Sequence, residues 1–463
     1  MSIMFLRPKA SRLRTVVCLG LLFGGLSGCA RFHALALPST TDTRLPGAIE
    51  REIYPPGGPK LSAERFDLDD GMNADEAVVV AVINNPDLKS TRLTAGVAAA
   101  QLLQAGLLPN PQLSADFTHP TSGPPPLFNG YSLGLNQDLL AIIARGAARA
   151  SAAAHVRDID LSILWQEWQT AERARQLYVQ SRAEQQMLDL LGERQQFDQQ
   201  RYDRQQTALA AGNTTRTAVA PVLVQLADTN SRLQTAAQQH NQTRHDFNLL
   251  LGLKPSVQLR LAGPMTLPVI DARTLASALA TVADRRPDLM ALKAGYESQQ
   301  QQVREAILRQ FPQLSIGPTQ ATDTSHVGMV GVGVSIGLPL FDHNQARIAQ
   351  QRATRALLRQ QYQARLDQAE SQAHQVFDKI SILSQRLAEL ESHLDELRQT
   401  ATAAQTSFDQ GNLGAGSYIT LRSSALDQRI AALQLRATLA QSEIALDTLL
   451  GRVSDLPVKG HAT

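Results

Sequence analysis

The chain has 463 residues, a formal net charge of +2 and 5% aromatic residues. So small a positive excess disfavours a nucleic-acid partner held by charge, and few aromatic residues beside long runs of Ala, Gln, Leu and Arg favour extended helix over a compact mixed core. The sequence contains neither a phosphate-binding Gly-x-x-x-x-Gly-Lys-Ser/Thr loop nor a Gly-x-Ser-x-Gly elbow. We therefore expect no catalytic residue, no cofactor and no enzyme activity.

Residues 1–28 have the pattern of a secretion signal. Their first half contains four basic residues and no acidic one. The apolar run that follows, 16–26, is shorter than the roughly 20 residues of a membrane-spanning helix. Removal of the four charges from +2 leaves the mature chain at −2.

The signal ends in Leu26-Ser27-Gly28-Cys29, which resembles the bacterial lipoprotein box. We expect Cys29 to become the acylated first residue of the mature chain, carrying palmitate; a plain signal peptide followed by a chance Cys is the alternative. By the same resemblance Ala30 is compatible with export to the outer membrane, since an Asp there commonly retains lipoproteins at the inner one. Cys18 lies in the removed segment, so no thiol remains for a disulfide, a metal or a nucleophile.

The rest of the chain is a duplicated half-protein. Pro111-Gln112-Leu113-Ser114 recurs 201 residues later as Pro312-Gln313-Leu314-Ser315. Other segments keep the same order at offsets of 201 or 199: 85–88 with 286–289, 211–213 with 410–412, and 250–252 with 449–451. A period near 200 is too long for a solenoid unit. The predicted parts are a leader 29–72, a first repeat 73–252, a linker 253–272, a second repeat 273–452 and a tail 453–463.

The first repeat begins with two short helices and a β-hairpin. Helices are expected at 73–85 and 87–107, because Pro86 interrupts one helical stretch. Apolar and polar residues then alternate at about 112–118 and 130–140, on either side of a loop rich in Gly and Pro. This pattern predicts two strands with one apolar face.

The second repeat contains the same hairpin, at about 312–322 and 329–340. Val330, Val332 and Val334 alternate there with Gly331 and Gly333. A strand with β-branched side chains on one face and small residues on the other fits a membrane-spanning strand of roughly 9–11 residues. An ordinary sheet edge over a soluble core is the alternative, but Gly weakens a strand unless the opposite face must stay open.

After each hairpin the chain is expected to form a very long helix and a long return helix. No Pro occurs between Pro126 and Pro221, and 147–211 alone would give roughly 95–100 Å of helix at 1.5 Å per residue. Leucines spaced 4, 3, 4 and 3 between 383 and 397 form a heptad-like seam. Such helices must pack side by side to be stable. Four strands cannot close a barrel in lipid, so the chain must oligomerise, and three copies would supply twelve strands.

These features together resemble the TolC family of outer-membrane channels, over residues 70–452. The resemblance is carried by the lipoprotein box, the duplicated halves and the paired helices, and by Asn-Pro-Asp-Leu at 85–88, Leu-Pro-Leu-Phe-Asp-His-Asn-Gln at 338–345 and Gly411-Asn412. The run 341–345 looks most like the CzcC-type branch, which serves heavy-metal or cation efflux.

The resemblance implies a mainly α-helical fold with a β-barrel part. Three chains would form a 12-strand transmembrane barrel in the outer membrane, in contact with its lipid, and a periplasmic α-barrel tunnel of paired helices. The implied function is that of the passive channel in a tripartite efflux system. The implied partners are two further copies of the chain, a periplasmic adaptor and an inner-membrane pump of the resistance–nodulation–division type.

The resemblance also places the periplasmic mouth at the two helix turns. The family's founding member has acidic residues just past the second turn, but the stretch 413–420 contains no acid, so an aspartate ring is not expected here. We take Arg216, Ser417 and Tyr418 as candidates for the mouth and hypothesise that Arg216 and Tyr418 narrow it. The alternative is that they contact the adaptor or are simple tip residues. The expected tip residues are Gly212, Asn213, Gly411, Asn412, Gly414 and Gly416.

Two other kinds of protein are weighed against this interpretation. The ten His are scattered, and His240 and His245 lie about 140° apart on a helix, so no metal site is expected. A lipid-anchored periplasmic coiled-coil adaptor or scaffold would share the signal, the acylated Cys and the long helices. It would not need alternating hairpins at equivalent places in both halves.

Overall fold

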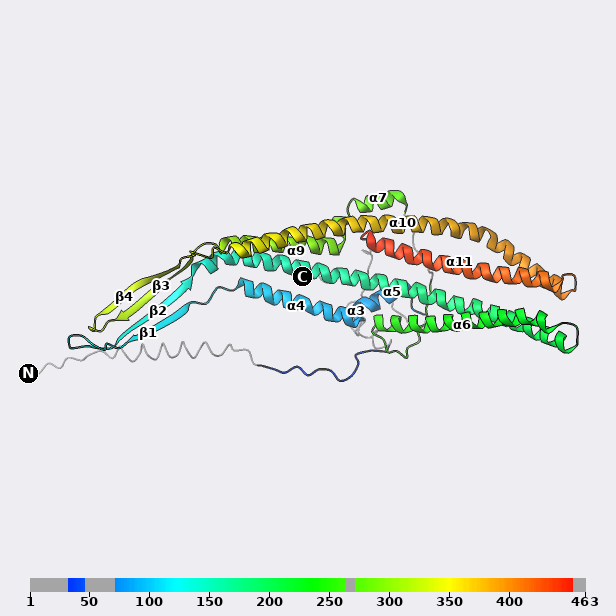
Figure 1. Cartoon of the computed structure of the whole chain (residues 1–463), viewed down its shortest axis with the longest axis horizontal. Coiled ribbons are helices and arrows are strands. Elements are labelled where there is room, and N and C mark those ends of the chain that lie inside the picture. The colour runs from blue at the N-terminus through cyan, green and yellow to red at the C-terminus, as the bar shows by residue number, and fades with distance from the viewer. Residues whose placement is uncertain (1–31, 46–70, 264–270, 453–463) are drawn as a thin grey trace, which may run out of the picture. The chain divides into compact units, whose positions relative to one another are not determined.

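The computed structural model describes residues 32–45, 71–263 and 271–452. The expected signal 1–28, Cys29, much of the leader and the tail therefore lie outside the described residues. The chain divides into two units, Met1–Asp42 and Thr43–Thr463. The second unit holds every helix and strand that follows (Figure 1).

The two halves of the second unit are built from corresponding elements. The first half contains α3 (Ala74–Asn84), α4 (Pro86–Gly106), β1 (Gln112–Thr118), β2 (Gly130–Asp138), α5 (Leu139–Ala210) and α6 (Arg216–Leu250). The second contains α7 (Ala272–Leu279), α8 (Val282–Arg285), α9 (Pro287–Leu308), β3 (Gln313–Thr322), β4 (Gly328–Gly337), α10 (Gln345–Asp409) and α11 (Ala415–Leu449).

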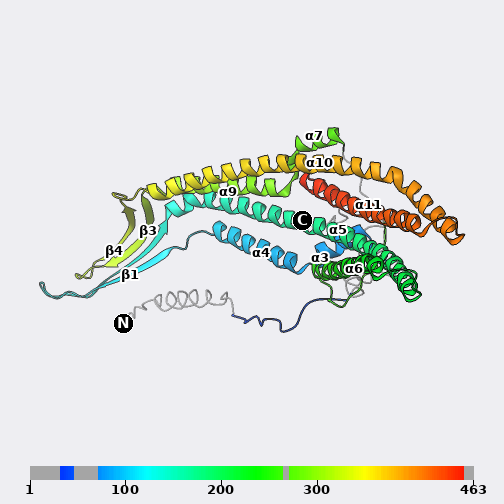
Figure 2. The ribbon, with the colours of Figure 1, turned by 45° about the vertical axis from the view of Figure 1, so that its right-hand side comes forward.

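The expected fold class, mainly α-helical with long paired helices and four strands, is confirmed. The helices α5 and α10 have 72 and 65 residues, and each packs against its return helix, α6 or α11. The heptad-like seam is confirmed too, because Leu387 is buried and the other seam leucines of α10 are half-buried. Within this unit the four strands lie at one end and the two helix turns at the other (Figures 1 and 2).

The long helix α5 begins earlier than the sequence indicated. We expected the strand to reach about 140 and the helix to start near 147, but β2 ends at Asp138 and α5 starts at Leu139. The Asp138 carboxylate accepts a hydrogen bond from the backbone N–H of Ala141, at 3.0 Å, and so caps the helix. Strand and helix are joined without a connecting loop.

The equivalent junction of the second half is different. β4 ends at Gly337, short of the expected 340, and α10 starts only at Gln345. Asn344, just before the helix, has a left-handed backbone with φ of 61°. Its side-chain amide donates to the carbonyl of Ala306 at the end of α9, at 2.7 Å. The run 341–345 thus has a structural role in closing the α9–α10 junction.

Both long helices end in the same turn, as the Gly-Asn pairs indicated. Gly212 and Gly411 have φ of +74° and +77°, a conformation that glycine adopts without steric cost. The N–H groups of Asn213 and Asn412 donate back to the carbonyls of Ala208 and Ser407, each at 2.8 Å. These bonds satisfy carbonyls that the helix end leaves free.

In both halves, the residue directly before a helix that begins with proline, α4 or α9, is hydrogen-bonded to the end of the return helix, α6 or α11. Asn85 donates its side-chain amide to the carbonyl of Leu250 at 3.0 Å, and Arg286, at the corresponding position, donates to the carbonyl of Leu449 at 3.4 Å. The largest buried apolar cluster lies beside these joints and includes Tyr178 and Leu251.

The sheet is antiparallel with the strand order β1-β2-β3-β4. Between β2 and β3 the ladder is interrupted opposite Pro318, which has no N–H to donate. At the neighbouring Gly317 the two backbones approach so closely that an added Cβ atom would lie 1.5 Å from the carbonyl oxygen of Leu135. Only glycine fits at this position.

We expect Gly317→Ala to prevent correct pairing of the two hairpins. The clash is with backbone, so no side-chain movement relieves it, and the yield of folded, heat-modifiable oligomer in detergent should fall by about tenfold or more. Gly331→Ala is the matched control on the next strand, because its Cβ would meet only the Thr319 hydroxyl, at an ordinary 3.5 Å. Equal yields from the two variants would contradict this account.

Candidate functional site

The four strands form a sheet with one apolar and one polar face. The register pairs apolar residues with one another: Leu113 with Leu135, Phe117 with Tyr131, and Ile316 with Val334. The residues between them point to the other face and are small or polar: Ser114, Asp116, Ser132, Gly134, Ser315, Gly317, Thr319, Gly331, Gly333 and Ser335.

Many side chains of the apolar face are exposed in the described part of the chain. Phe117 is 87% and Val330 84% exposed, which is typical of a surface that meets lipid or another protein. Among the described residues, β1 and β4 each pair with one strand only. The sheet therefore has two edges whose backbone groups need partners.

The polar face contains little charge. Within β1–β4 the only charged side chains are Asp116 and Asp138. The Ser132 hydroxyl donates to the Asp116 carboxylate at 3.0 Å, whereas Asp138 caps α5. Because glycine and serine are most of the other residues, this face has only short side chains.

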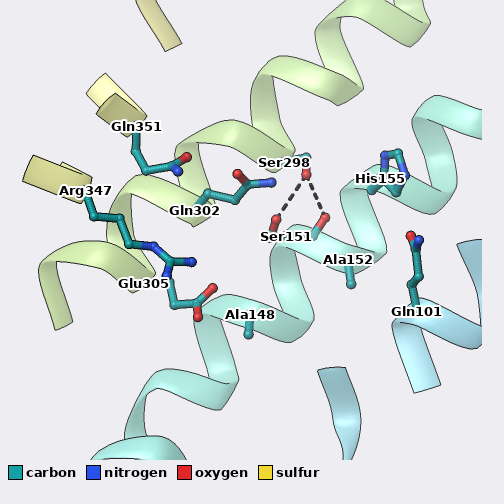
Figure 3. A pocket seen from close by; sticks show the side chains of 10 residues that line it. All are labelled: Gln101, Ala148, Ser151, Ala152, His155, Ser298, Gln302, Glu305, Arg347 and Gln351. Carbon is teal, nitrogen blue, oxygen red and sulfur yellow. Dashed lines mark hydrogen bonds between the residues drawn. The ribbon is translucent and has the colours of Figure 1, made fainter. Parts of the chain in front are cut away.

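A polar cavity of about 340 Å³ lies among the four helices that connect to the sheet, two of which precede a strand and two of which follow one. Figure 3 shows its lining converge from α4, α5, α9 and α10. Ser298 donates to the carbonyl of Ser151 at 3.0 Å, and its hydroxyl is also 3.0 Å from that of Ser151. Glu305 and Arg347 supply opposite charges on the same lining. The helices next to the sheet thus have a polar cavity of their own.

One acidic group near this cavity has a shifted pKa. Burial raises the pKa of Asp158, which lies one helical turn from His155, and the imidazole and the Ser162 hydroxyl only partly oppose that shift. The His155 ring nitrogen is 3.5 Å from the carboxylate.

The residues predicted for the mouth lie in two different environments. Arg216 and Ser417 are exposed at the two turns, as are all six expected tip glycines and asparagines. Tyr418 is only 6% exposed. Its ring stacks on Phe408 at 4.7 Å and meets Phe197 edge-on at 5.9 Å, and its hydroxyl donates to the side-chain carbonyl of Gln405. That Arg216 and Tyr418 narrow the mouth stays a prediction. The structure shows in addition that Tyr418 packs between aromatic side chains.

Above the turns, ion pairs join the two hairpins. Arg194 of α5 donates to the Asp427 carboxylate of α11 at 2.9 Å. Glu193 lies 2.9 Å from the guanidinium of Arg429 and 3.4 Å from that of Arg422. Sequence reasoning did not find these pairs, because periodicity shows which residues share a helix face and not which helix comes next to it.

A buried carboxylate supports this network from within the first hairpin. Asp198 is fully buried and accepts hydrogen bonds from Arg194 at 3.0 Å and from Thr229 of α6 at 2.8 Å. It therefore fixes Arg194 in the position that reaches Asp427. No group of three or more His, Cys, Asp or Glu that could hold a metal ion occurs in the part of the chain that the structure describes.

The comparisons with known proteins agree with this architecture. Residues 278–452 match the family model described as outer membrane efflux protein. The outer-membrane channel OprN superposes with a TM-score of 0.68 at 17% identity, over 91% of this chain and 99% of its own. The CmeC outer membrane channel of Campylobacter jejuni gives 0.69 at 15% identity, over 92% and 97%. CusC gives 0.64 at 18% identity, over 91% and 99%. The search of curated proteins found no match.

Proposed function

We propose that this chain belongs to the outer membrane efflux protein family, that of the TolC-type channels, and that three copies form a continuous conduit across the outer membrane and the periplasm. Each copy would contribute four strands to a closed barrel and two long helical hairpins to a tunnel. The conduit is passive, and an inner-membrane pump supplies the energy.

One observation carries this proposal: an amphipathic sheet with two unpaired edges is joined to helices that line a polar cavity, and one of its strands, β2, continues directly into such a helix. An exposed apolar face of this size is unfavourable in water. Open edges are not tolerated in lipid, so the sheet can enter a membrane only as part of a closed barrel. A scaffold anchored by lipid alone, the second candidate, has no use for such a sheet.

The transported substrate is inferred from the charges of the strands and from one sequence run. We propose that the substrate is a cation, because Asp116 and Asp138 are the only charged residues of the four strands and the run 341–345 resembles the heavy-metal branch. Since Asn344 and its neighbours also close the α9–α10 junction, part of that run is required by the fold. The proposed partners are a periplasmic adaptor and a pump of the resistance–nodulation–division type.

Single-channel recording tests the conduit. The purified full-length protein, reconstituted into planar bilayers, should give discrete conductance steps from a trimeric species. A water-soluble monomer that produces no steps would exclude the channel and favour the scaffold. Reversal potentials in a salt gradient would then show whether cations pass preferentially.

The lipid anchor is a separate prediction. Mass spectrometry of the mature protein should find an acylated N-terminus at Cys29, and Cys29→Ser should abolish the added mass. The variant should still form trimers, because the sheet itself holds the barrel in lipid. An unmodified N-terminus at another residue would exclude the anchor and leave the channel unaffected.

A further inference from the structure

The end of the two hairpins contains a second cavity, of about 120 Å³, that conduction does not require. It is bounded by both hairpins, with side chains from α5, α6, α10 and α11: Phe197, Arg201, Arg204, Val222, Phe408 and Tyr418. A molecule bound here would contact the two hairpins at once.

The walls of the cavity are aromatic, and its size admits no more than one further ring. Phe408 and Tyr418 are stacked with an interplanar angle of 8°, and Phe197 lies edge-on to Tyr418. Stacked and edge-on contacts of this kind favour a further ring beyond the area that it buries. An apolar cavity of roughly 150 Å³ holds a benzene molecule, so 120 Å³ limits the ligand to a single ring.

The charged groups of the cavity are both cationic. The guanidinium of Arg204 lies 5.6 Å from the centre of the Phe408 ring, and that of Arg201 lies 6.0 Å from the Phe197 ring. No acidic side chain is among the lining residues. Within the described part of the chain, Arg204 has no carboxylate at ion-pairing distance. A negatively charged ligand would therefore be favoured.

Arg201 has unused hydrogen-bonding capacity at the same place. One of its terminal nitrogens donates to Asp198 at 3.3 Å, but its Nε is buried and has no hydrogen-bond partner. A buried donor without a partner is unfavourable, and a guanidinium pairs best with a planar carboxylate. The cavity thus offers an aromatic wall next to two donors for one anionic group.

We propose that this cavity binds a single-ring aromatic carboxylate such as benzoate. The ring contacts Phe408 and Tyr418, and the carboxylate accepts hydrogen bonds from Arg204 and Arg201. Bound ligand holds the two hairpins together at their tips; the importance of this effect for transport rests on the proposed channel function.

Calorimetric titration of the detergent-solubilised full-length protein tests the site. Benzoate should bind at one site per protomer, and benzyl alcohol, which has the ring without the charge, should bind about tenfold more weakly or worse. Arg204→Gln and Phe408→Leu should each weaken benzoate binding by about tenfold. Arg398→Gln, an exposed arginine on α10 about 15 Å from Phe408 along the helix, should leave it unchanged.

Hydrogen exchange separates this proposal from the channel function. Benzoate should slow amide exchange in the first turns of α11, around Tyr418, whether or not the protein conducts. No saturable binding, equal binding of the alcohol, or unchanged affinity in both cavity variants would overturn the site. Binding with normal exchange around Tyr418 would overturn the effect on the hairpins, whereas binding by a protein that forms no channel would leave the site intact and exclude the conduit.

Discussion

Arg286→Ala is expected to lower the free energy of unfolding by about 3–5 kcal/mol, because it leaves a buried carboxylate without its main partner. Arg286 is 1% exposed and lies 2.6 Å from the Asp288 carboxylate and 5.0 Å from the centre of the Trp165 ring. Arg365 of α10, at 2.8 Å, is the other partner of Asp288. The loss also removes the hydrogen bond to the carbonyl of Leu449, which joins the two ends of the second half.

Thermal unfolding of the purified protein in detergent would measure this effect. Arg285→Ala is the matched control, since Arg285 is exposed and precedes Arg286 directly. The control should change the melting temperature little. A similar small change for Arg286→Ala would contradict the role assigned to the buried pair.

The same pair should make stability depend on pH. Burial acts to raise the pKa of Asp288, but hydrogen bonds and charge from Arg286 and Arg365 outweigh it, and the pKa is lowered overall. A carboxyl whose pKa is lowered in the folded state stabilises the protein above its unfolded pKa. That stabilisation is lost as the pH falls through the lowered value. In Arg286→Ala the melting temperature should therefore decrease less on acidification than in the unaltered chain.

The double variant Glu193→Gln and Asp427→Asn is expected to weaken the contact between the hairpins and to open the tips. It removes the ion pairs with Arg429, Arg422 and Arg194 while changing the side-chain volumes little. Because Glu193 is 37% and Asp427 55% exposed, solvent screens these pairs, and together they contribute about 1 kcal/mol per protomer. The ratio of open to closed channels should rise about fivefold for each protomer.

Single-channel recording would show this change as longer open times or larger steps. Asp228→Asn is the control, because its ion pair with Arg232, at 2.8 Å, lies within α6 and does not cross between the hairpins. If the double variant and the control conduct alike, the pairs between α5 and α11 do not restrain the tips.

Much of this fold could be predicted from residue periodicity. The alternation of Val330, Val332 and Val334 with glycine indicated both the strand and its two faces, and the Gly-Asn pairs indicated where α5 and α10 end. Local rules suffice at these positions, since the backbone itself selects the residue type. The predicted start of α5 was wrong because Asp138 is both the last residue of β2 and the N-cap of α5. The periodicity of apolar residues alone does not locate such a boundary.

The contacts of the tips could not be predicted in this way. Tyr418 follows a glycine-rich turn and was predicted only as a candidate residue of the mouth, but Phe197, more than 200 residues earlier in the chain, covers it. Glu193 and Arg429 are 236 residues apart. Such pairs depend on which helices become neighbours, a property of the assembled fold that a single sequence does not display.

The two junctions between sheet and helix give the two hairpins unequal freedom. At the first, the capped start of α5 follows β2 directly, so any rotation of the strand must turn α5 with it and the first hairpin moves only as the sheet moves. At the second, residues 338–344 lie between β4 and α10 and belong to neither a strand nor a helix. This connecting segment can therefore change its backbone angles when α10 rotates relative to β4. We therefore expect any movement of one tip relative to the other to come from the second hairpin, while the first hairpin stays coupled to the sheet.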